Sequence, residues 1–154
     1  MLSKKQFIAL VKNAPLISID LIIRNGKGHI LLGKRKNNPA KGFYFVPGGR
    51  IFKNESLTSA LSRLLSEELH LTVADFDDIR QFKVYEHFYK NENVYNIAGM
   101  DTHYIVIAHS LKLKNENILP TNVEDQQHSG YIWMPVNELM ENKNVHDNTK
   151  LFFK

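Results

Sequence analysis

The sequence predicts one α/β domain in which several strands are arranged around a central helix. Residues 56–71 repeat apolar side chains at helical spacing, and residues 17–23 form an apolar run of strand length. The Asn25-Gly26 pair is a strong signal for a tight turn between two strands. With 154 residues, 43% of them apolar, the chain can bury one sizeable core. We therefore expect a single domain over residues 1–154.

The N-terminal half of the chain contains the helix and the first strands of this fold. A helix over about residues 4–13 has Ser3 at its N-cap and is ended by Pro15. The strand at residues 17–23 follows, and residues 29–34 are expected to return beside it as a hairpin. The central helix comes after a turn that contains two adjacent glycines.

The C-terminal half alternates strands with polar segments. Pro135 suits the first turn of a helix, because its missing N–H would be unpaired there anyway. Two polar stretches, residues 90–101 and 115–129, are expected to form long loops, which often carry function in compact domains. The remaining predicted elements are strands near residues 81–89, 103–113 and 131–133 and helices over residues 136–140 and 148–153.

Composition excludes several classes of function. The absence of cysteine rules out disulfides, thiolate catalysis and a cysteine zinc site. The net charge of +4 suits a phosphorylated ligand but is too diffuse to indicate nucleic acid. No apolar run approaches the roughly twenty residues that span a bilayer, and the opening Met1-Leu2-Ser3-Lys4-Lys5 is not typical of a signal sequence. We expect a cytoplasmic protein with neither a membrane nor a nucleic-acid partner.

The central helix carries a carboxylate where a core residue is expected. Its apolar stripe consists of Leu57, Ala60, Leu61, Leu64 and Leu65, and Glu68 falls in the middle of this stripe. An ionised carboxylate that faces a core is costly unless it is paired, protonated or bound to a metal. The pattern leaves three explanations open: a divalent cation, a buried arginine partner, or a helix end from which the side chain reaches solvent.

The same region resembles the Nudix box, the loop-helix motif of hydrolases that act on nucleoside diphosphates linked to another group. Gly49 and Glu55 are followed by Arg63-Leu64-Leu65-Ser66-Glu67-Glu68-Leu69-His70-Leu71 at the spacing of this motif. The chain departs from the family pattern at Leu64, where a glutamate is expected, and at His70, where a glycine is expected. The resemblance implies a Nudix-type α/β/α sandwich with a mixed sheet.

With these departures, the chain resembles the GDP-mannose mannosyl hydrolase branch of the superfamily, whose box is altered in the same way. Members of this branch remove the sugar from GDP and do not split the diphosphate. This branch implies a homodimer. Shorter matches to it are spread along nearly the whole chain, at residues 15–20, 31–35, 39–50, 86–89, 102–104, 127–128 and 144–146.

The resemblance implies a Mg²⁺ site formed by the Gly48 carbonyl, Glu68 and Gln127. Adjacent glycines allow the backbone to turn sharply and approach a ligand, although such a pair is also common in ordinary loops. One carboxylate and two neutral oxygens would hold the ion weakly, so nucleotide and metal should bind together. Glu67 lies four residues after Arg63, and we interpret it as a partner in a surface ion pair.

Asp20 and His128 are candidate catalytic residues. Asp20 interrupts an apolar strand, so it needs either a buried hydrogen bond to the backbone or a catalytic role. The resemblance places it beside the reacting sugar. His128 lies in a predicted polar loop next to a possible metal ligand, where a neutral imidazole could accept a proton from water. His87 and His103 lie in aromatic-rich predicted strands and are interpreted as structural.

The remaining candidates would bind the nucleotide. Arg35 and Arg50 flank the glycine pair, and paired guanidinium donors suit diphosphate oxygens, which gives both a predicted catalytic role as well as substrate binding. Lys36 adds to the same basic edge, Tyr104 could donate a hydrogen bond to phosphate, and Phe7 could pack on guanine. Solvated surface positions for the basic residues, and core packing for the two aromatics, are the alternatives.

The resemblance therefore implies Mg²⁺-dependent hydrolysis of GDP-mannose, with GDP-glucose as a second candidate, by attack of water at the anomeric carbon with inversion. One alternative keeps the superfamily but places the attack at phosphorus. The other is a non-catalytic domain that senses nucleotides, which the incomplete box favours. No residue in the sequence distinguishes one GDP-sugar from another.

Overall fold

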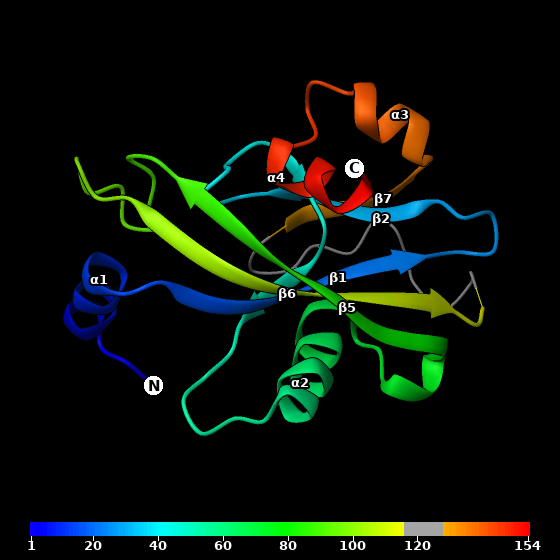
Figure 1. Cartoon of the computed structure of the whole chain (residues 1–154), viewed down its shortest axis with the longest axis horizontal. Helices are drawn as coiled ribbons and strands as arrows, with labels where there is room; N and C mark the ends of the chain where they lie inside the picture. Colours follow the sequence, from blue (N-terminus) through cyan, green and yellow to red (C-terminus); the bar gives the residue numbers. More distant parts are fainter. Residues whose placement is uncertain (116–127) are drawn as a thin grey trace.

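The computed structural model describes residues 1–115 and 128–154, with only the backbone described at residues 128 and 129. Its centre is a seven-stranded mixed sheet. Figure 1 shows helix α2 on one face of this sheet and helices α3 and α4 on the other, which confirms the predicted α/β sandwich. Within the described residues, no helix has the length and apolar character needed to cross a bilayer.

The helices lie close to their predicted positions. Helix α1 begins after Ser3, whose hydroxyl accepts from the Gln6 amide in a capping box. Helix α2 begins after Ser56 and ends at His70, which adopts a left-handed conformation with φ of 55°. The helical segments are α1 Lys4–Asn13, α2 Leu57–Leu69, α3 Val136–Glu141 and α4 Asp147–Lys150, with short 3₁₀ turns at Val73–Asp75 and Leu151–Phe153.

The sheet contains two short strands that the sequence did not predict. These are β3 and β4, on either side of residues 46–47. The seven strands are β1 Leu16–Arg24, β2 Ile30–Arg35, β3 Tyr44–Phe45, β4 Gly48–Arg50, β5 Phe76–Tyr89, β6 Thr102–Leu113 and β7 His128–Met134. The order along the sheet is β3-β2-β1-β6-β5, with β4 paired to β1 and β7 paired to β2.

The predicted hairpin between β1 and β2 is correct only at its turn. The Asn25 carboxamide oxygen accepts from the amides of Lys27 and His29, each at 3.0 Å, and Arg24 pairs with Ile30. Beyond that pair the strands separate: on the same edge of β1, residues 18–20 pair with β4, while β2 pairs with β3 and β7. On its other edge β1 pairs in parallel with β6 along its whole length. Strand β1 is buried on both faces, as expected for a central strand with a parallel neighbour.

The sheet separates two hydrophobic cores. Leu61, Leu64 and Leu65 of α2 pack against Ile19 and Leu21 of β1 on one face. Leu139 of α3 and Phe152 pack against Ile22 and Leu32 on the other. Because side chains alternate along β1, the strand contributes to both cores and fixes where its polar residues Ser18 and Asp20 emerge.

Candidate functional site

A cavity of about 250 Å³ opens where β1, β4 and β6 meet helix α1 and the β2–β3 connection. It brings together six residues that the sequence predicted to act at one site, although they come from five separate parts of the chain. These residues are Phe7, Asp20, Arg35, Gly48, Arg50 and Tyr104. Lys36 is not among the described residues that line the cavity.

Asp20 is the acidic side chain of this cavity. It is 7% exposed, and its Oδ2 atom has no hydrogen-bond partner among the described residues. Burial raises the pKa of the Asp20 carboxyl to about 7, and the nearby charge of Arg35 opposes part of this rise. This environment does not support the alternative in which Asp20 is a structural residue satisfied by the backbone.

Gly48 pairs directly with Asp20, and only glycine fits at this position. A Cβ atom there would lie 2.7 Å from Asp20 Oδ1 and even closer to the carbonyl oxygen of Ile19. The sequence predicted a glycine turn at positions 48 and 49, whereas the structure has the short strand β4. Close contact between two strands therefore explains the glycine, independently of any ligand.

Two arginines place positive charge at the cavity. Arg35 ends β2, and its Nε donates to the Pro39 carbonyl at 2.8 Å. Arg50 ends β4, and its guanidinium carbon lies 5.2 Å from the ring centre of Phe7. Tyr104 lies on β6, and burial raises the pKa of its phenol. The cavity can therefore hold an anionic ligand between paired donors.

The box helix presents its two glutamates differently. Glu68 is 8% exposed, so its side chain does not reach solvent as one of the alternatives required. Glu67 is exposed and forms the predicted ion pair, with its Oε2 atom 3.2 Å from Arg63 Nη1. Leu64, one turn before Glu68, is buried in the core.

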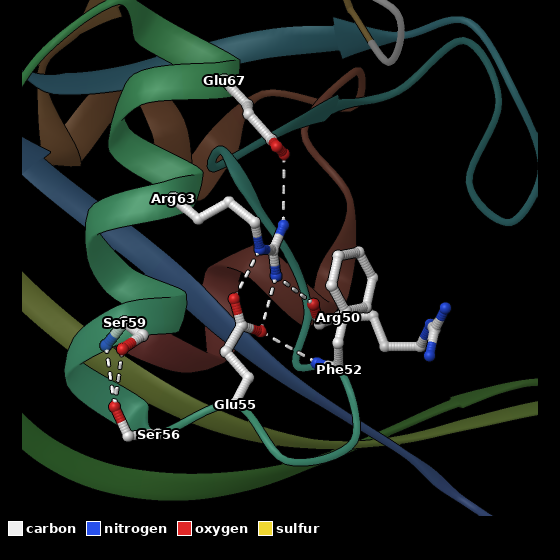
Figure 2. A network of polar contacts seen from close by, with 7 residues as sticks. All are labelled: Arg50, Phe52, Glu55, Ser56, Ser59, Arg63 and Glu67. Atoms are coloured by element: carbon white, nitrogen blue, oxygen red, sulfur yellow. Dashed lines mark hydrogen bonds and ion pairs between the residues drawn. The ribbon is translucent and has the colours of Figure 1, made fainter. Parts of the chain in front are cut away.

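Arg63 connects the box helix to the loop before it (Figure 2). Its Nε and Nη2 atoms donate to the two carboxylate oxygens of Glu55 at 2.6 and 3.0 Å, and Nη2 also donates to the Arg50 carbonyl at 2.9 Å. This hydrogen bonding lowers the pKa of Glu55 and raises that of Arg63. The pair therefore fixes the strand-loop-helix segment that carries Gly48 and Arg50.

The predicted metal ligands and base are only partly described. Gln127 and the side chain of His128 lie outside the described residues. His128 is the first residue of β7, and its backbone pairs with that of Arg35. The prediction that His128 lies in a loop is therefore wrong. The described residues contain no group of three or more acidic or histidine side chains placed so that it could hold a metal ion. The Glu68 carboxylate and the Gly48 carbonyl are oxygen donors of the kind that Mg²⁺ prefers, but Gly48 lines the cavity whereas Glu68 is not among the described residues that line it.

Other cavity residues were missed by the sequence predictions. His87, interpreted as structural, also lines the cavity and is 2% exposed. Burial, with a smaller contribution from His146, lowers its pKa to about 4. Tyr89 lies two residues further along β5 and lines the same cavity. Their spacing of two was a signal that they share one face, but it could not show which face would meet the site.

Comparison with known proteins identifies the family. A family model described as NUDIX domain matches residues 14–154, so the chain belongs to the Nudix hydrolases. It is 44% identical over 122 residues to low-salt glycan biosynthesis protein Agl8 of Haloferax volcanii, a match that covers 79% of this chain and 71% of that one.

Two further relatives are less similar. The chain is 37% identical over 79 residues to an 8-oxo-dGTP diphosphatase of Buchnera aphidicola, covering 51% of this chain and 58% of the relative. Its structure resembles that of a MutT NUDIX hydrolase from Burkholderia pseudomallei with a TM-score of 0.68. That match has 22% identity and covers 90% and 95% of the two chains, which supports the shared fold alone.

Proposed function

We propose that this Nudix hydrolase cleaves GDP-mannose, with GDP-glucose as a second substrate, to GDP and the free sugar by attack of water at the anomeric carbon. The box helix carries the main support for this proposal. It contributes one buried carboxylate, Glu68, while Leu64 is buried in the core and Glu67 is paired with Arg63. A helix with a single buried carboxylate suits a reaction in which the leaving diphosphate needs stabilisation and the attacked atom is not phosphorus.

In this reaction the sugar and the diphosphate of the substrate occupy different parts of the cavity. Water attacks C1 from the face opposite the nucleotide, His128 accepts the proton, and the electrons of the C1–O bond pass to the β-phosphate oxygen of GDP. The configuration at C1 is therefore inverted. A carboxyl with a pKa of about 7, such as that of Asp20, can hydrogen-bond a sugar hydroxyl or stabilise positive charge at the ring.

Arg35 and Arg50 stabilise the departing GDP. Their charges interact more strongly with the β-phosphate as the C1–O bond breaks, so they lower the energy of the transition state more than that of the bound substrate. Mg²⁺ held by the Gly48 carbonyl, Glu68 and Gln127 would supply further positive charge to the diphosphate. Tyr104 and Phe7 line the same cavity and would contact phosphate and guanine.

The relative Agl8 gives independent support. Its name assigns it to glycan biosynthesis, and nucleotide sugars are the activated donors from which glycans are built. A hydrolase of GDP-sugars therefore suits the similarity better than an enzyme for altered nucleotides.

Hydrolysis in ¹⁸O-labelled water tests the site of attack. We expect the label in free mannose and unlabelled GDP as the second product, measured by mass spectrometry. Label in GMP or in mannose phosphate would show attack at phosphorus. His128→Gln should lower kcat by a factor of roughly 10² or more while GDP remains bound. Glu68→Gln should lower kcat to a similar extent and also weaken Mg²⁺-dependent GDP binding, because nucleotide and metal are expected to bind together.

Attack at phosphorus is the second candidate, because the relative from Buchnera aphidicola is an 8-oxo-dGTP diphosphatase. The same labelling experiment with 8-oxo-dGTP as substrate distinguishes the two. Faster turnover of 8-oxo-dGTP than of GDP-mannose would favour this candidate. No turnover of either substrate with Mg²⁺, together with normal GDP binding, would instead favour a nucleotide-sensing domain.

A further inference from the structure

The guanidinium of Arg50 is held by aromatic rings. Its carbon lies 5.2 Å from the ring centre of Phe7 on helix α1 and 4.9 Å from that of Phe52, which follows β4. Within the described residues, the Arg50 side chain forms neither a hydrogen bond nor an ion pair. Arg50 also lines the cavity, so its donors are available where a ligand would bind.

This kind of contact leaves an arginine able to bind a second group. An aromatic ring packs against the face of the guanidinium, whereas the five N–H donors point outward in its plane. A carboxylate partner would occupy those donors. Ring contacts therefore limit the side-chain conformations of Arg50 without using the groups that would bind phosphate oxygens.

Phe52 is itself held in place although it is 40% exposed. The Arg63 guanidinium carbon lies 3.9 Å from its ring centre, and the Phe52 amide donates to Glu55 Oε2 at 2.9 Å. Arg63 is fixed in turn by its two hydrogen bonds to Glu55. Figure 2 shows the Phe52 ring between the guanidinium groups of Arg63 and Arg50.

These contacts explain why an exposed phenylalanine lies beside Arg50. The Phe52 ring contacts Arg63, which is paired with Glu55, and it also contacts Arg50, so the ring links the ion pair to the Arg50 guanidinium. An arginine that is ordered before the ligand arrives loses less side-chain entropy on binding.

We propose that Phe52 is a positioning residue, whose ring orients the Arg50 guanidinium for the diphosphate of the substrate. The proposal rests on the proposed function only for the identity of the substrate, since any ligand with a diphosphate would use the same donors. It assigns Phe52 no contact with the ligand.

A double-mutant cycle on GDP binding tests this role. The dissociation constant of GDP with Mg²⁺ is measured by calorimetry for the wild type, Phe52→Ala, Arg50→Ala and the double variant. We expect Phe52→Ala to weaken binding roughly 3- to 30-fold in the wild-type background and less than about twofold when Arg50 is already absent. Phe52→Tyr keeps the ring and should restore binding.

Phe82→Ala is the matched control, because Phe82 on β5 is 44% exposed, similar to Phe52, and does not line the cavity. It should bind GDP as the wild type does. Melting temperatures of all variants separate loss of folding from loss of orientation.

Equal losses in both backgrounds would overturn the proposal, because Phe52 would then act on stability or on the ligand directly. Unchanged affinity in Phe52→Ala would also overturn it, as would a wild-type protein that does not bind GDP. A wild type that binds GDP but releases no mannose would contradict the proposed function alone, and the cycle would still be measurable.

Discussion

At the scale of single residues, the cavity depends on the close approach of β4 to β1 at Gly48. The space that a side chain would need is occupied by the Ile19 carbonyl and the Asp20 carboxyl, so any Cβ must push the two strands apart. Since Asp20 and Arg50 lie on these same strands, a shift would move two predicted site residues at once.

Gly48→Ala tests this dependence. We expect the free energy of unfolding to fall by roughly 1 to 3 kcal/mol from overpacking, and GDP-mannose turnover to fall by at least tenfold. Urea denaturation and product assays measure the two effects. Gly99→Ala is the control: with φ of 75° it strains the backbone, but nothing lies within 4 Å of its Cβ and the residue is outside the cavity. Equal activity of the two variants at equal stability would contradict the expectation.

Single residues also show what the sequence could predict. Helical spacing alone predicted that Glu68 lies on the buried stripe and that Glu67 lies one turn after Arg63 on the same face. The structure confirms both placements. The surroundings of Gly48 could not be predicted in this way, because they depend on pairing between strands almost thirty residues apart in the sequence.

At the scale of elements, the β5–β6 connection over residues 90–101 contributes Val94 to the lining of the cavity. Asn93 is 1% exposed, donates to the carbonyls of Ile97 and Met100, and accepts from the Ile97 amide. Glu92 accepts from the Ala40 amide at 2.8 Å, which joins this connection to the β2–β3 loop. The predicted long loop is therefore organised by its own polar residues.

Asn93→Ala should disrupt this organisation. Three backbone groups lose their partner, so we expect a loss of roughly 2 to 4 kcal/mol in the free energy of unfolding. The KM for GDP-mannose should rise, because Val94 and Thr102 line the cavity. Asn13→Ala removes an exposed hydrogen bond to the Ala9 carbonyl at the end of α1 and should change stability by less than about 0.5 kcal/mol. A similar small change in Asn93→Ala, measured by urea denaturation, would refute the role of the buried carboxamide.

Helices and strands were predicted best where they are long enough to repeat the apolar spacing of a helix or a strand several times. The helices α1 and α2 and the strands β1 and β6 are long enough for this, and they appear near the expected positions. Strands of two or three residues, such as β3 and β4, contain no repeat. The partners of β1 and β2 were predicted wrongly beyond the turn, because pairing between distant strands leaves no local pattern.

At the scale of the whole molecule, the site is assembled across the sheet. Asp20, Arg35, Arg50 and Tyr104 come from four strands, and their meeting depends on the strand order. The spacing of these residues in the sequence could not place them together. The family resemblance did so, because it carries information about the fold that composition and periodicity lack.

The folding of the whole chain should also depend on pH through His87. The ring of His87 is buried among aromatic side chains, including those of Phe45, Tyr89 and Phe152. Its pKa is lowered from 6.5 to about 4, chiefly by burial. Between these two values the unfolded chain binds a proton that the folded chain does not, so acid favours unfolding in this range. The contribution of neutral His87 is complete above pH 6.5 and is lost as the pH falls toward 4.

Replacing His87 should therefore flatten the acid side of the stability profile. For each protein, urea denaturation without ligand gives the fall in the free energy of unfolding between pH 7.5 and pH 5. This fall should be about 2 kcal/mol larger for the wild type than for His87→Gln. His70→Gln, at an exposed position, is the control and should follow the wild type. Parallel profiles for wild type and His87→Gln would contradict this prediction, because they would mean that the imidazole has the same pKa in the folded and the unfolded chain and that burial does not lower it.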